Sequence, residues 1–232
     1  MNVALVLAAG SGSRMENLNE PKQFVMVNDK PLFIYSVESF QNNPNIDMIF
    51  IATNPSYIEQ VEDWCKIYNL TKVKSVFMGG SSRQGSVWNG LKKMHDYIKS
   101  PNDIVLIHDA ARPLVSQRII NDNISFCKRY GAVDTVIQAS DTIFITKDDE
   151  TIDEILNRDE LYQSQTPQTF EYGIINEAHL MALTDGVPNV TDDCKLVMHF
   201  GTQVHFVSGD KLNFKITTSE DLALFKAIVD RK

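Results

Sequence analysis

The stretch Met1-Asn2-Val3-Ala4-Leu5-Val6-Leu7-Ala8-Ala9-Gly10-Ser11-Gly12-Ser13-Arg14 decides the fold of this chain. Its apolar first half predicts a buried strand, and its second half predicts a loop of small residues directly after that strand. Such a loop exposes backbone N–H groups and lets a polyanion approach closely. Arg14 and, eight residues later, Lys22 of Pro21-Lys22-Gln23 add positive charge on the same side. This combination suits a nucleoside triphosphate.

The loop matches neither of the two commoner phosphate-binding patterns. The pattern G-x-x-x-x-G-K-[ST] needs Lys and Ser or Thr after its second glycine, but Gly12 is followed by Ser13-Arg14. The pattern G-x-G-x-x-G fails because Met15 stands in place of its third glycine. Taken alone, the segment is equally consistent with a plain Gly/Ser connection in which Arg14 and Lys22 are surface cations.

Length and composition are those of an ordinary globular protein. The 232 residues, 43% of them hydrophobic, can form one large domain over 1–232. The net charge of −8 argues against nucleic-acid or anionic-membrane partners. No apolar stretch has the length of a membrane span and no signal-peptide pattern is present, so we expect a cytoplasmic protein. Cys65, Cys127 and Cys194 have neither metal spacing nor a disulfide framework.

Apolar runs alternate with amphipathic segments along most of the chain. The predicted strands cover 3–7, 46–53, 73–78, 103–108, 132–138 and 203–207. The predicted helices cover 31–41, 56–68, 82–98, 116–130, 172–183 and 218–230. This alternation predicts an α/β fold in which a mainly parallel sheet is covered by helices on both faces.

Residues 133–170 break the alternation because they contain no convincing amphipathic helix. Two β-rich segments there surround the polar turn Lys147-Asp148-Asp149-Glu150 and predict a two-stranded excursion. An isolated hairpin is marginal in water, so it should pack on another surface. We expect residues 136–165 to form a β-arm that contacts a second subunit. An edge extension of the main sheet is the alternative.

A second constellation, His108-Asp109-Ala110-Ala111-Arg112-Pro113, follows the predicted strand 103–108. Ligands of open α/β sheets lie beyond the carboxyl ends of the strands, so Asp109 should lie at the same edge as the first loop. Its carboxylate could hold Mg²⁺ together with phosphate oxygens, and Arg112 could bind a phosphate. Alternatively, Asp109 caps a turn and Arg112 is its ion-pair partner. His108 is better read as a satisfied polar residue than as a general base.

A third constellation is Gly79-Gly80-Ser81-Ser82-Arg83-Gln84-Gly85-Ser86, between a predicted strand and a predicted helix. The backbone amide of Gly80 and the hydroxyl of Ser86 could contact a pyrimidine base or a ribose. The alternative is a Gly-Gly turn in which Ser82 caps the helix, and that role is compatible with binding.

Taken together, these motifs resemble the cytidylyltransferases that act on polyol phosphates. The resemblance covers nearly the whole chain and rests on an ordered set of segments: LAAGSGSRM with PKQ, GGSSRQGSV, HDAARP, DTI, NR with QTPQTF, TDDCKLV and NFKITTSEDL. It implies a Rossmann-like three-layer fold with a protruding β-arm, a homodimer, and Mg²⁺ as the cofactor. Ser81 departs from the family, because this position is often acidic in the erythritol-phosphate enzymes.

The resemblance also implies a role for individual residues. The catalytic group would be Arg14, Lys22 and Lys215. The nucleotide would be bound by Leu7, Ala8, Ala9, Gly10, Gly12, Gly80, Ser81, Arg83 and Ser86, and the metal by Asp109. The polyol phosphate would be bound by Arg112, Thr142, Arg158 and Thr191, with Thr142 and Arg158 entering the partner subunit's site from the arm.

The expected reaction is the transfer of CMP from CTP to a polyol phosphate. An acceptor phosphate has a second pKa of about 6 and is already anionic at neutral pH, so the absence of a nucleophile–base pair in the sequence is consistent with it. The later motifs favour D-ribitol 5-phosphate as the acceptor, and 2-C-methyl-D-erythritol 4-phosphate is the alternative. A nucleotide-sugar glycosyltransferase, which would usually carry an Asp-x-Asp motif, and a non-catalytic CTP-binding protein are more distant alternatives.

Overall fold

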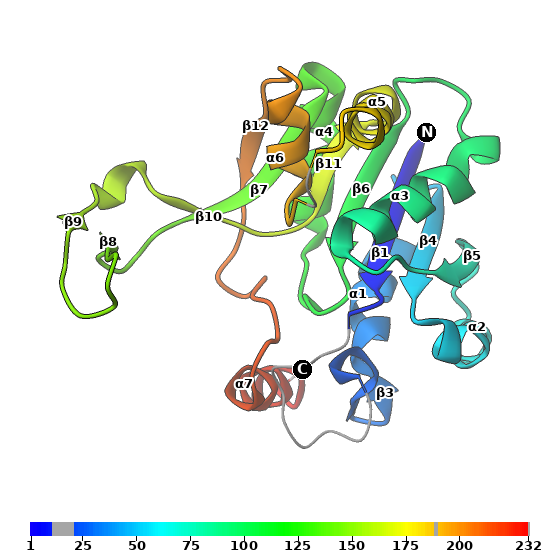
Figure 1. The fold of residues 1–232 in the computed structure, drawn as a ribbon. Coiled ribbons are helices and arrows are strands. Elements are labelled where there is room, and N and C mark those ends of the chain that lie inside the picture. Colours follow the sequence, from blue (N-terminus) through cyan, green and yellow to red (C-terminus); the bar gives the residue numbers. More distant parts are fainter. Residues whose placement is uncertain (11–20, 188–189, 232) are drawn as a thin grey trace.

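The core of the molecule is an eight-stranded sheet, seen near the centre of Figure 1. The computed structural model describes residues 1–10, 21–187 and 190–231. The order β10-β7-β11-β6-β1-β4-β5 runs across the sheet, and β12 also pairs with β7. The strands are β1 (Asn2–Ala8), β4 (Met48–Thr53), β5 (Val73–Met78), β6 (Ile104–Asp109), β7 (Ala132–Gln138), β10 (Tyr162–Ser164), β11 (Gln168–Glu171) and β12 (His205–Ser208).

The central strands are parallel, as the β-α alternation predicts. β1 pairs in parallel with both β4 and β6, and β5 continues the parallel order beside β4. β11 and β10 run antiparallel to their neighbours. The prediction of a mainly parallel sheet is therefore confirmed, while the short strands β10 and β11 were not predicted.

Helices cover both faces of the sheet and make the molecule three layers deep (Figure 1). One face carries α1 (Leu32–Gln41), α2 (Ile58–Ile67) and α4 (Gln117–Tyr130), and the other carries α3 (Arg83–Met94), α5 (Tyr172–Thr184) and α6 (Asp193–His199). Side chains of β1 alternate between the two cores: Ala4 and Val6 face the first, Val3 and Leu5 the second. Burial on both faces explains why this strand reads as a continuous apolar run.

A smaller apolar cluster closes the side of the molecule near the C-terminus. The helix α7 (Ser219–Val229) packs there against the hairpin β2 (Met26–Val27) and β3 (Lys30–Pro31) and the start of α1. A capping box at Thr218 and Asp221 fixes the beginning of this helix. Four short 3₁₀ helices complete the described structure: η1 (Lys22–Phe24), η2 (Pro55–Tyr57), η3 (His95–Tyr97) and η4 (Arg158–Glu160).

A β-arm leaves the sheet between β7 and β10 and projects well beyond the body of the molecule (Figure 1). It carries the two-stranded sheet β8 (Phe144–Ile145) and β9 (Glu154–Ile155). The segment expected as the arm, 136–165, overlaps the main sheet at both ends, because β7 continues to Gln138 and β10 pairs with it. β10 extends the edge of the main sheet, while β8 and β9 form a separate hairpin. Contact of the arm with a second subunit stays a prediction.

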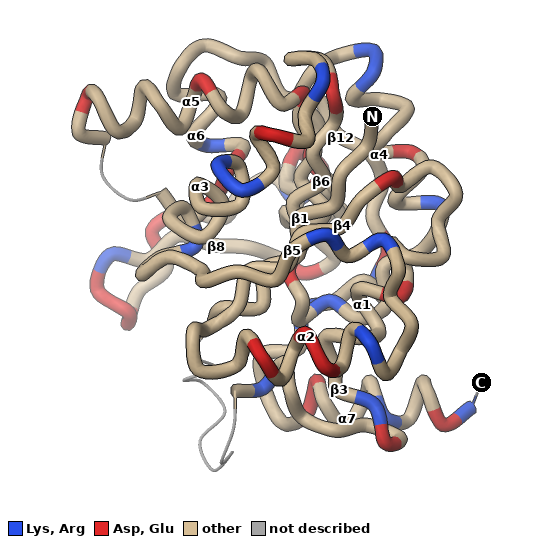
Figure 2. Tube along the Cα trace, turned by 90° about the vertical axis from the view of Figure 1, so that its right-hand side faces the viewer, with Lys and Arg blue, Asp and Glu red and all other residues tan. Residues whose placement is uncertain are grey.

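Charged residues are distributed over the fold without separation by sign on the side shown in Figure 2. Within the described ranges, the helices are too short or too polar to cross a membrane.

Candidate active site

A pocket of about 430 Å³ opens at the carboxyl ends of β1 and β6. It is built from the loop after β1, the 3₁₀ helix η1, the loop before α3, the turn after β6, and a segment preceding α7. Its lining is Leu7, Ala8, Ala9, Gly10, Lys22, Gln23, Gly80, Ser81, Ser82, Arg83, Ser86, Asp109, Ala110, Ala111 and Lys215. The structure thus brings together every predicted nucleotide, catalytic and metal residue that it describes. The predicted residues Gly12 and Arg14 lie outside the described residues.

Gln23 fixes the start of the small-residue loop, a role that sequence analysis did not assign. Its side-chain amide donates to the carbonyl oxygens of Ala8 at 2.7 Å and Gly10 at 2.9 Å. Gln23 is 3% exposed, so these hydrogen bonds are protected from water. The neighbouring Lys22 donates from Nζ to the carbonyl oxygen of Ile216 at 2.8 Å. The P-K-Q segment therefore ties the loop after β1 to the chain just before α7.

The loop Gly79–Ser86 is ordered by hydrogen bonds among its own residues. Ser82 caps α3 by accepting from the Gly85 amide at 3.0 Å, as predicted. The Ser86 hydroxyl accepts from the Gly80 amide at 3.0 Å and donates to the Ser82 carbonyl at 2.9 Å. A Cβ at Gly80 would lie 2.4 Å from the backbone carbon of Gly85, so only glycine allows this close approach.

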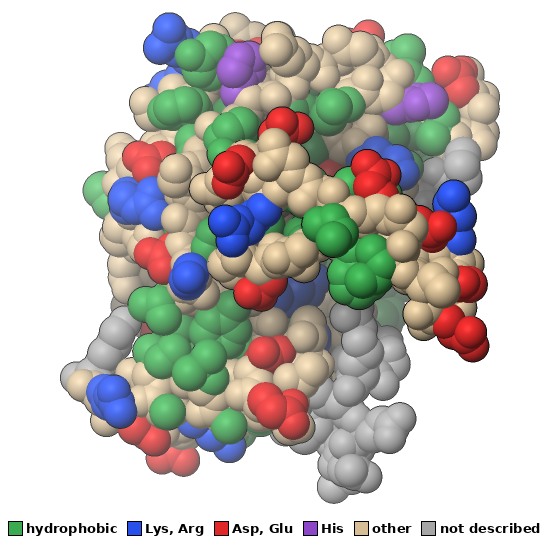
Figure 3. Space-filling view, turned by 90° about the vertical axis from the view of Figure 1, so that its left-hand side faces the viewer, with side chains coloured by type: hydrophobic (Ala, Val, Ile, Leu, Met, Phe, Trp, Pro, Cys, Tyr) green, Lys and Arg blue, Asp and Glu red, His purple; other side chains and the backbone are tan. Residues whose placement is uncertain are grey.

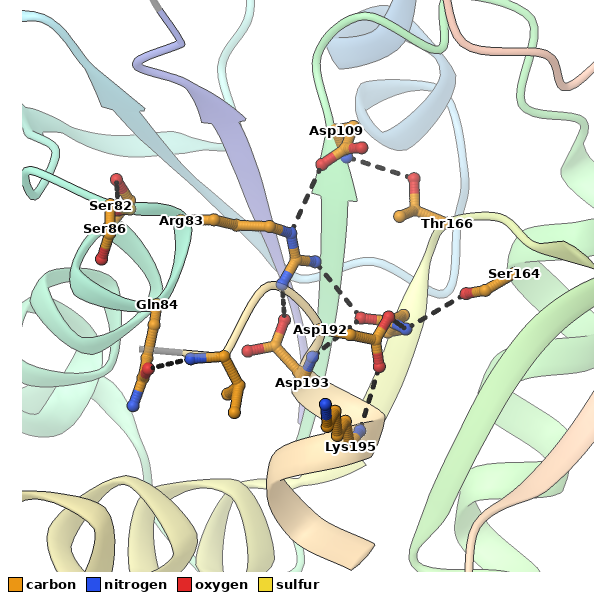
Figure 4. Close-up of polar contacts among 12 residues, drawn as sticks. Ser82, Arg83, Gln84, Ser86, Asp109, Ser164, Thr166, Asp192, Asp193 and Lys195 are labelled. Atoms are coloured by element: carbon orange, nitrogen blue, oxygen red, sulfur yellow. Dashed lines mark hydrogen bonds and ion pairs between the residues drawn. The ribbon is translucent and has the colours of Figure 1, made fainter. Parts of the chain in front are cut away.

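Asp109 forms the centre of the charged part of the pocket. Its Oδ2 lies 2.7 Å from Lys215 Nζ, and its Oδ1 lies 3.8 Å from Arg83 Nε; Figure 4 shows Arg83 between Asp109 and Asp193. Burial alone would raise the pKa of Asp109, but Lys215 and Arg83 outweigh it and hold the pKa well below its usual range. The carboxylate is therefore charged at neutral pH.

The donor chemistry at Asp109 fits a magnesium ion that a nucleotide brings with it. Mg²⁺ is commonly held by one or two carboxylates, and waters and phosphate oxygens complete its coordination. Groups of three or more His, Cys, Asp or Glu side chains able to hold a metal do not occur among the described residues. A site with one protein carboxylate, completed by triphosphate oxygens, is the arrangement that these residues allow.

Two strand-end residues differ in role. His108 is fully buried, with Nε2 3.1 Å from the Arg112 carbonyl and Nδ1 2.9 Å from the Thr166 hydroxyl, and burial lowers its pKa to about 4. The prediction that it is a satisfied polar residue is confirmed. Arg112 donates to the carbonyl oxygens of Asn213 at 2.8 Å and Ser164 at 3.4 Å. These contacts replace the ion pair with Asp109 that one interpretation expected.

The four predicted acceptor residues are not among the residues that line the pocket. Thr142 and Arg158 are exposed on the arm. Thr191 is exposed just before α6, and Arg112 lies half-buried after β6. Their contact with the acceptor stays a prediction.

Sequence analysis missed a polar layer behind Arg83. Arg83 contacts the carboxylate of Asp193 and donates to Gln168 Oε1 at 3.2 Å. Gln168 in turn donates to Asp192 Oδ2 at 2.7 Å and to Asp134 Oδ1 at 3.3 Å. Gln168 belongs to QTPQTF, and Asp192 and Asp193 belong to TDDCKLV, two segments of the resemblance in which the sequence analysis assigned no role to these three side chains.

Comparison with known proteins connects this geometry to one family. The model of the family described as IspD, 2-C-methyl-D-erythritol 4-phosphate cytidylyltransferase, matches residues 2–231. The chain belongs to this family. A curated relative, 2-C-methyl-D-erythritol 4-phosphate cytidylyltransferase of Clostridium novyi (strain NT), is 40% identical over 230 residues, which cover 99% of this chain and 96% of the relative.

Solved structures support the same assignment. The 4-diphosphocytidyl-2C-methyl-D-erythritol synthase of Anaerococcus prevotii superposes with a TM-score of 0.84 at 27% identity, covering 99% of this chain and 96% of that one. The 2-C-methyl-D-erythritol 4-phosphate cytidylyltransferase of Thermus thermophilus superposes with a TM-score of 0.79 at 28% identity, covering 99% of this chain and all of the other. The resemblance to polyol-phosphate cytidylyltransferases is confirmed: the chain is a nucleotidyltransferase that uses CTP and a phosphorylated sugar alcohol.

Proposed function

We propose that this cytidylyltransferase transfers CMP from CTP to 2-C-methyl-D-erythritol 4-phosphate and releases pyrophosphate. The observation that carries the proposal is the family match over residues 2–231, joined by the 40% identity to the Clostridium novyi enzyme. These comparisons support methylerythritol phosphate better than D-ribitol 5-phosphate, which the sequence motifs favoured. The product would be the 4-diphosphocytidyl derivative of the acceptor.

The reaction needs positioning and charge neutralisation more than acid–base chemistry. An oxygen of the acceptor phosphate attacks the α-phosphorus of CTP, and the bond from that phosphorus to the oxygen shared with the β-phosphate breaks. The nucleophile is already an anion at neutral pH, so the side chains must orient it and offset the developing negative charge. We assign this task to Lys22 and Lys215, which line the pocket, and on sequence grounds to Arg14.

Asp109 is our proposed metal ligand. Bound Mg²⁺ would supply positive charge to the triphosphate oxygens. The chain contributes a carboxylate that Lys215 and Arg83 keep ionised. The small residues Ala110 and Ala111, which line the pocket beside it, leave space for a phosphate group.

We further propose that the chain acts as one domain and forms a homodimer through the arm. Several large apolar side chains of the arm are exposed: Phe144 at 52%, Ile152 at 59% and Ile155 at 64%. Figure 3 looks onto the arm and shows hydrophobic side chains grouped on this face of the molecule. Exposed apolar groups of this kind mark interfaces. A partner arm would bring Thr142 and Arg158 to the acceptor, together with Arg112 and Thr191 of the receiving subunit.

The test is pyrophosphate release with CTP and Mg²⁺, comparing 2-C-methyl-D-erythritol 4-phosphate with D-ribitol 5-phosphate. Turnover of methylerythritol phosphate alone is the expected result. Turnover of ribitol phosphate alone would show that the acceptor is D-ribitol 5-phosphate and that the reaction type is as proposed. Turnover of neither acceptor would contradict the proposed reaction. ATP in place of CTP serves as the control for base selection.

A further inference from the structure

Asp193 is a buried carboxylate that does not line the pocket but contacts a residue that does. It is the first residue of α6 and is 1% exposed. One carboxylate oxygen accepts a hydrogen bond from Arg83 Nη1, and the other lies 3.6 Å from Nε2 of the buried His179. Burial would raise the pKa of Asp193, but Arg83 and His179 lower it below its usual range. The buried charge is therefore retained and paired.

Arg83 is fixed from three directions. Besides Asp193, its guanidinium contacts Gln168 Oε1 at 3.2 Å through Nη2 and Asp109 Oδ1 at 3.8 Å through Nε. Gln168 is itself oriented, because its Oε1 also accepts from the Asp193 amide at 3.3 Å. The guanidinium fork is planar and rigid, so two hydrogen-bond acceptors and one nearby carboxylate restrict its orientation. Figure 4 shows the Arg83 side chain with its contacts to the carboxylates of Asp109 and Asp193.

Asp109 depends on the same arginine. Its carboxylate lies between Lys215 and Arg83, and both contacts hold it toward the pocket. A chain of alternating charges therefore runs from Asp193 through Arg83 and Asp109 to Lys215. Asp193 and Lys215, at the two ends of this series of charges, are 22 residues apart in the sequence, and Asp193 and Arg83 are 110 residues apart.

We propose that Asp193 is a positioning residue, which acts through Arg83 to hold the nucleotide pocket in its binding geometry. A purely structural role, in which Asp193 only neutralises a buried arginine, makes different predictions. In that case loss of the Asp193 carboxylate would lower the free energy of unfolding without changing the affinity of the folded protein for CTP. This inference rests on the proposed function only in assigning CTP to the pocket, so CTP binding is measured directly and without an acceptor.

The first variant is Asp193→Asn, which keeps the shape of the side chain and removes its charge. We expect the Kd for CTP with Mg²⁺, measured by calorimetry, to rise about tenfold or more, the loss typical of a hydrogen bond to a charged group. The KM for CTP should rise more than kcat falls. His179→Gln is the matched control, because it changes the other neighbour of the same carboxylate and leaves the contact with Arg83. It should keep the Kd within about threefold of the wild type.

A double-mutant cycle separates the two interpretations. If Asp193 acts through Arg83, then adding Asp193→Asn to Arg83→Gln leaves the Kd of the Arg83→Gln variant unchanged. An equal increase in the Kd for CTP when Asp193→Asn is added to the wild type and to Arg83→Gln would overturn the proposal. A wild-type Kd for the Asp193→Asn single variant would also overturn it. Should Asp193→Asn fail to fold, Asp193→Glu decides. It keeps the charge pair but moves the carboxylate by one methylene, so an unchanged Kd contradicts positioning and an increased Kd supports it.

The wild-type protein is assayed separately for turnover with both acceptors. Failure of the wild type to release pyrophosphate would count against the proposed function. The relative CTP affinities of the variants would still decide the role of Asp193.

Discussion

Replacing Asp134 by Asn should stabilise the protein at neutral pH. Asp134 lies on β7, is 9% exposed, and accepts from Gln168 Nε2 at 3.3 Å. Burial, assisted by the nearby Asp192 carboxylate, raises the pKa of Asp134 from 3.8 to about 6. At pH 7.5 the folded protein therefore carries a charge that its surroundings disfavour. Asparagine has the same shape and can still accept from Gln168.

The size and sign of the effect follow from the pKa. A rise of about 2 corresponds to about 3 kcal/mol at 1.36 kcal/mol per pKa unit, which is an upper limit for the gain at pH 7.5. Because the pKa is raised on folding, the wild type gains stability from Asp134 as the pH falls from about 6 to about 4. The variant lacks this gain. The difference between the two proteins should therefore be about 1–3 kcal/mol at pH 7.5 and should shrink towards zero at pH 4.

Urea unfolding at pH 7.5 and pH 4.5, at one protein concentration, measures this difference. Asp122→Asn is the control, because Asp122 belongs to an exposed ion pair with Arg118 and its loss should change stability by no more than about 1 kcal/mol. A variant less stable than the wild type at pH 7.5 would refute the reasoning. That result would mean that the Asp134 charge is favourably paired in the folded protein. A difference independent of pH would also refute the reasoning, because it would mean that folding does not raise the pKa of Asp134.

Three further predictions concern the site and the arm. Lys22→Ala should lower kcat by about 10²-fold or more while the protein stays folded, because the side chain no longer offsets the negative charge of the reacting phosphate; near-normal pyrophosphate release would contradict its assigned role. Gly80→Ala should destabilise the protein, since its Cβ would lie 2.4 Å from Gly85, whereas Gly10→Ala, whose Cβ would have no described atom within 4 Å, should keep its melting temperature. Ile155→Lys should shift the protein to monomer in sedimentation and lower turnover; an intact dimer would exclude the arm as the interface.

The long apolar elements were predictable because burial on two faces leaves a strong pattern in the sequence. β5 and β7 have the predicted boundaries. Most of the predicted helix ends lie within two residues of the observed ends. β11 was missed because it is short and polar. Gln168 and Thr169 are buried there, but their side chains bond to polar groups of α4 and α6. A pattern based on hydrophobicity cannot detect a buried strand whose polar groups are satisfied by distant residues.

The same reason limits what the sequence indicates about the site. The motifs placed the pocket residues at one edge of the sheet, because parallel strands bring their carboxyl ends together. They could not show that Arg83 meets Asp193, since that contact depends on the packing of α6 against the sheet. α6 has seven residues, too few for a clear amphipathic period. The hairpin of the arm was expected from two β-rich segments around a polar turn, but each of its two strands is only two residues long.

The charge arrangement explains how an acidic protein can bind a polyanion. The chain carries a net charge of −8, so long-range attraction does not favour a triphosphate. The cations of the pocket are instead held in place before binding: Lys215 by Asp109, Arg83 by Asp193, and Lys22 by the Ile216 carbonyl. Groups that are already oriented lose little freedom on binding and stabilise developing charge without rearrangement. Each acceptor that fixes a cation also offsets part of its charge, so the geometry of these pairs matters more than the number of cations.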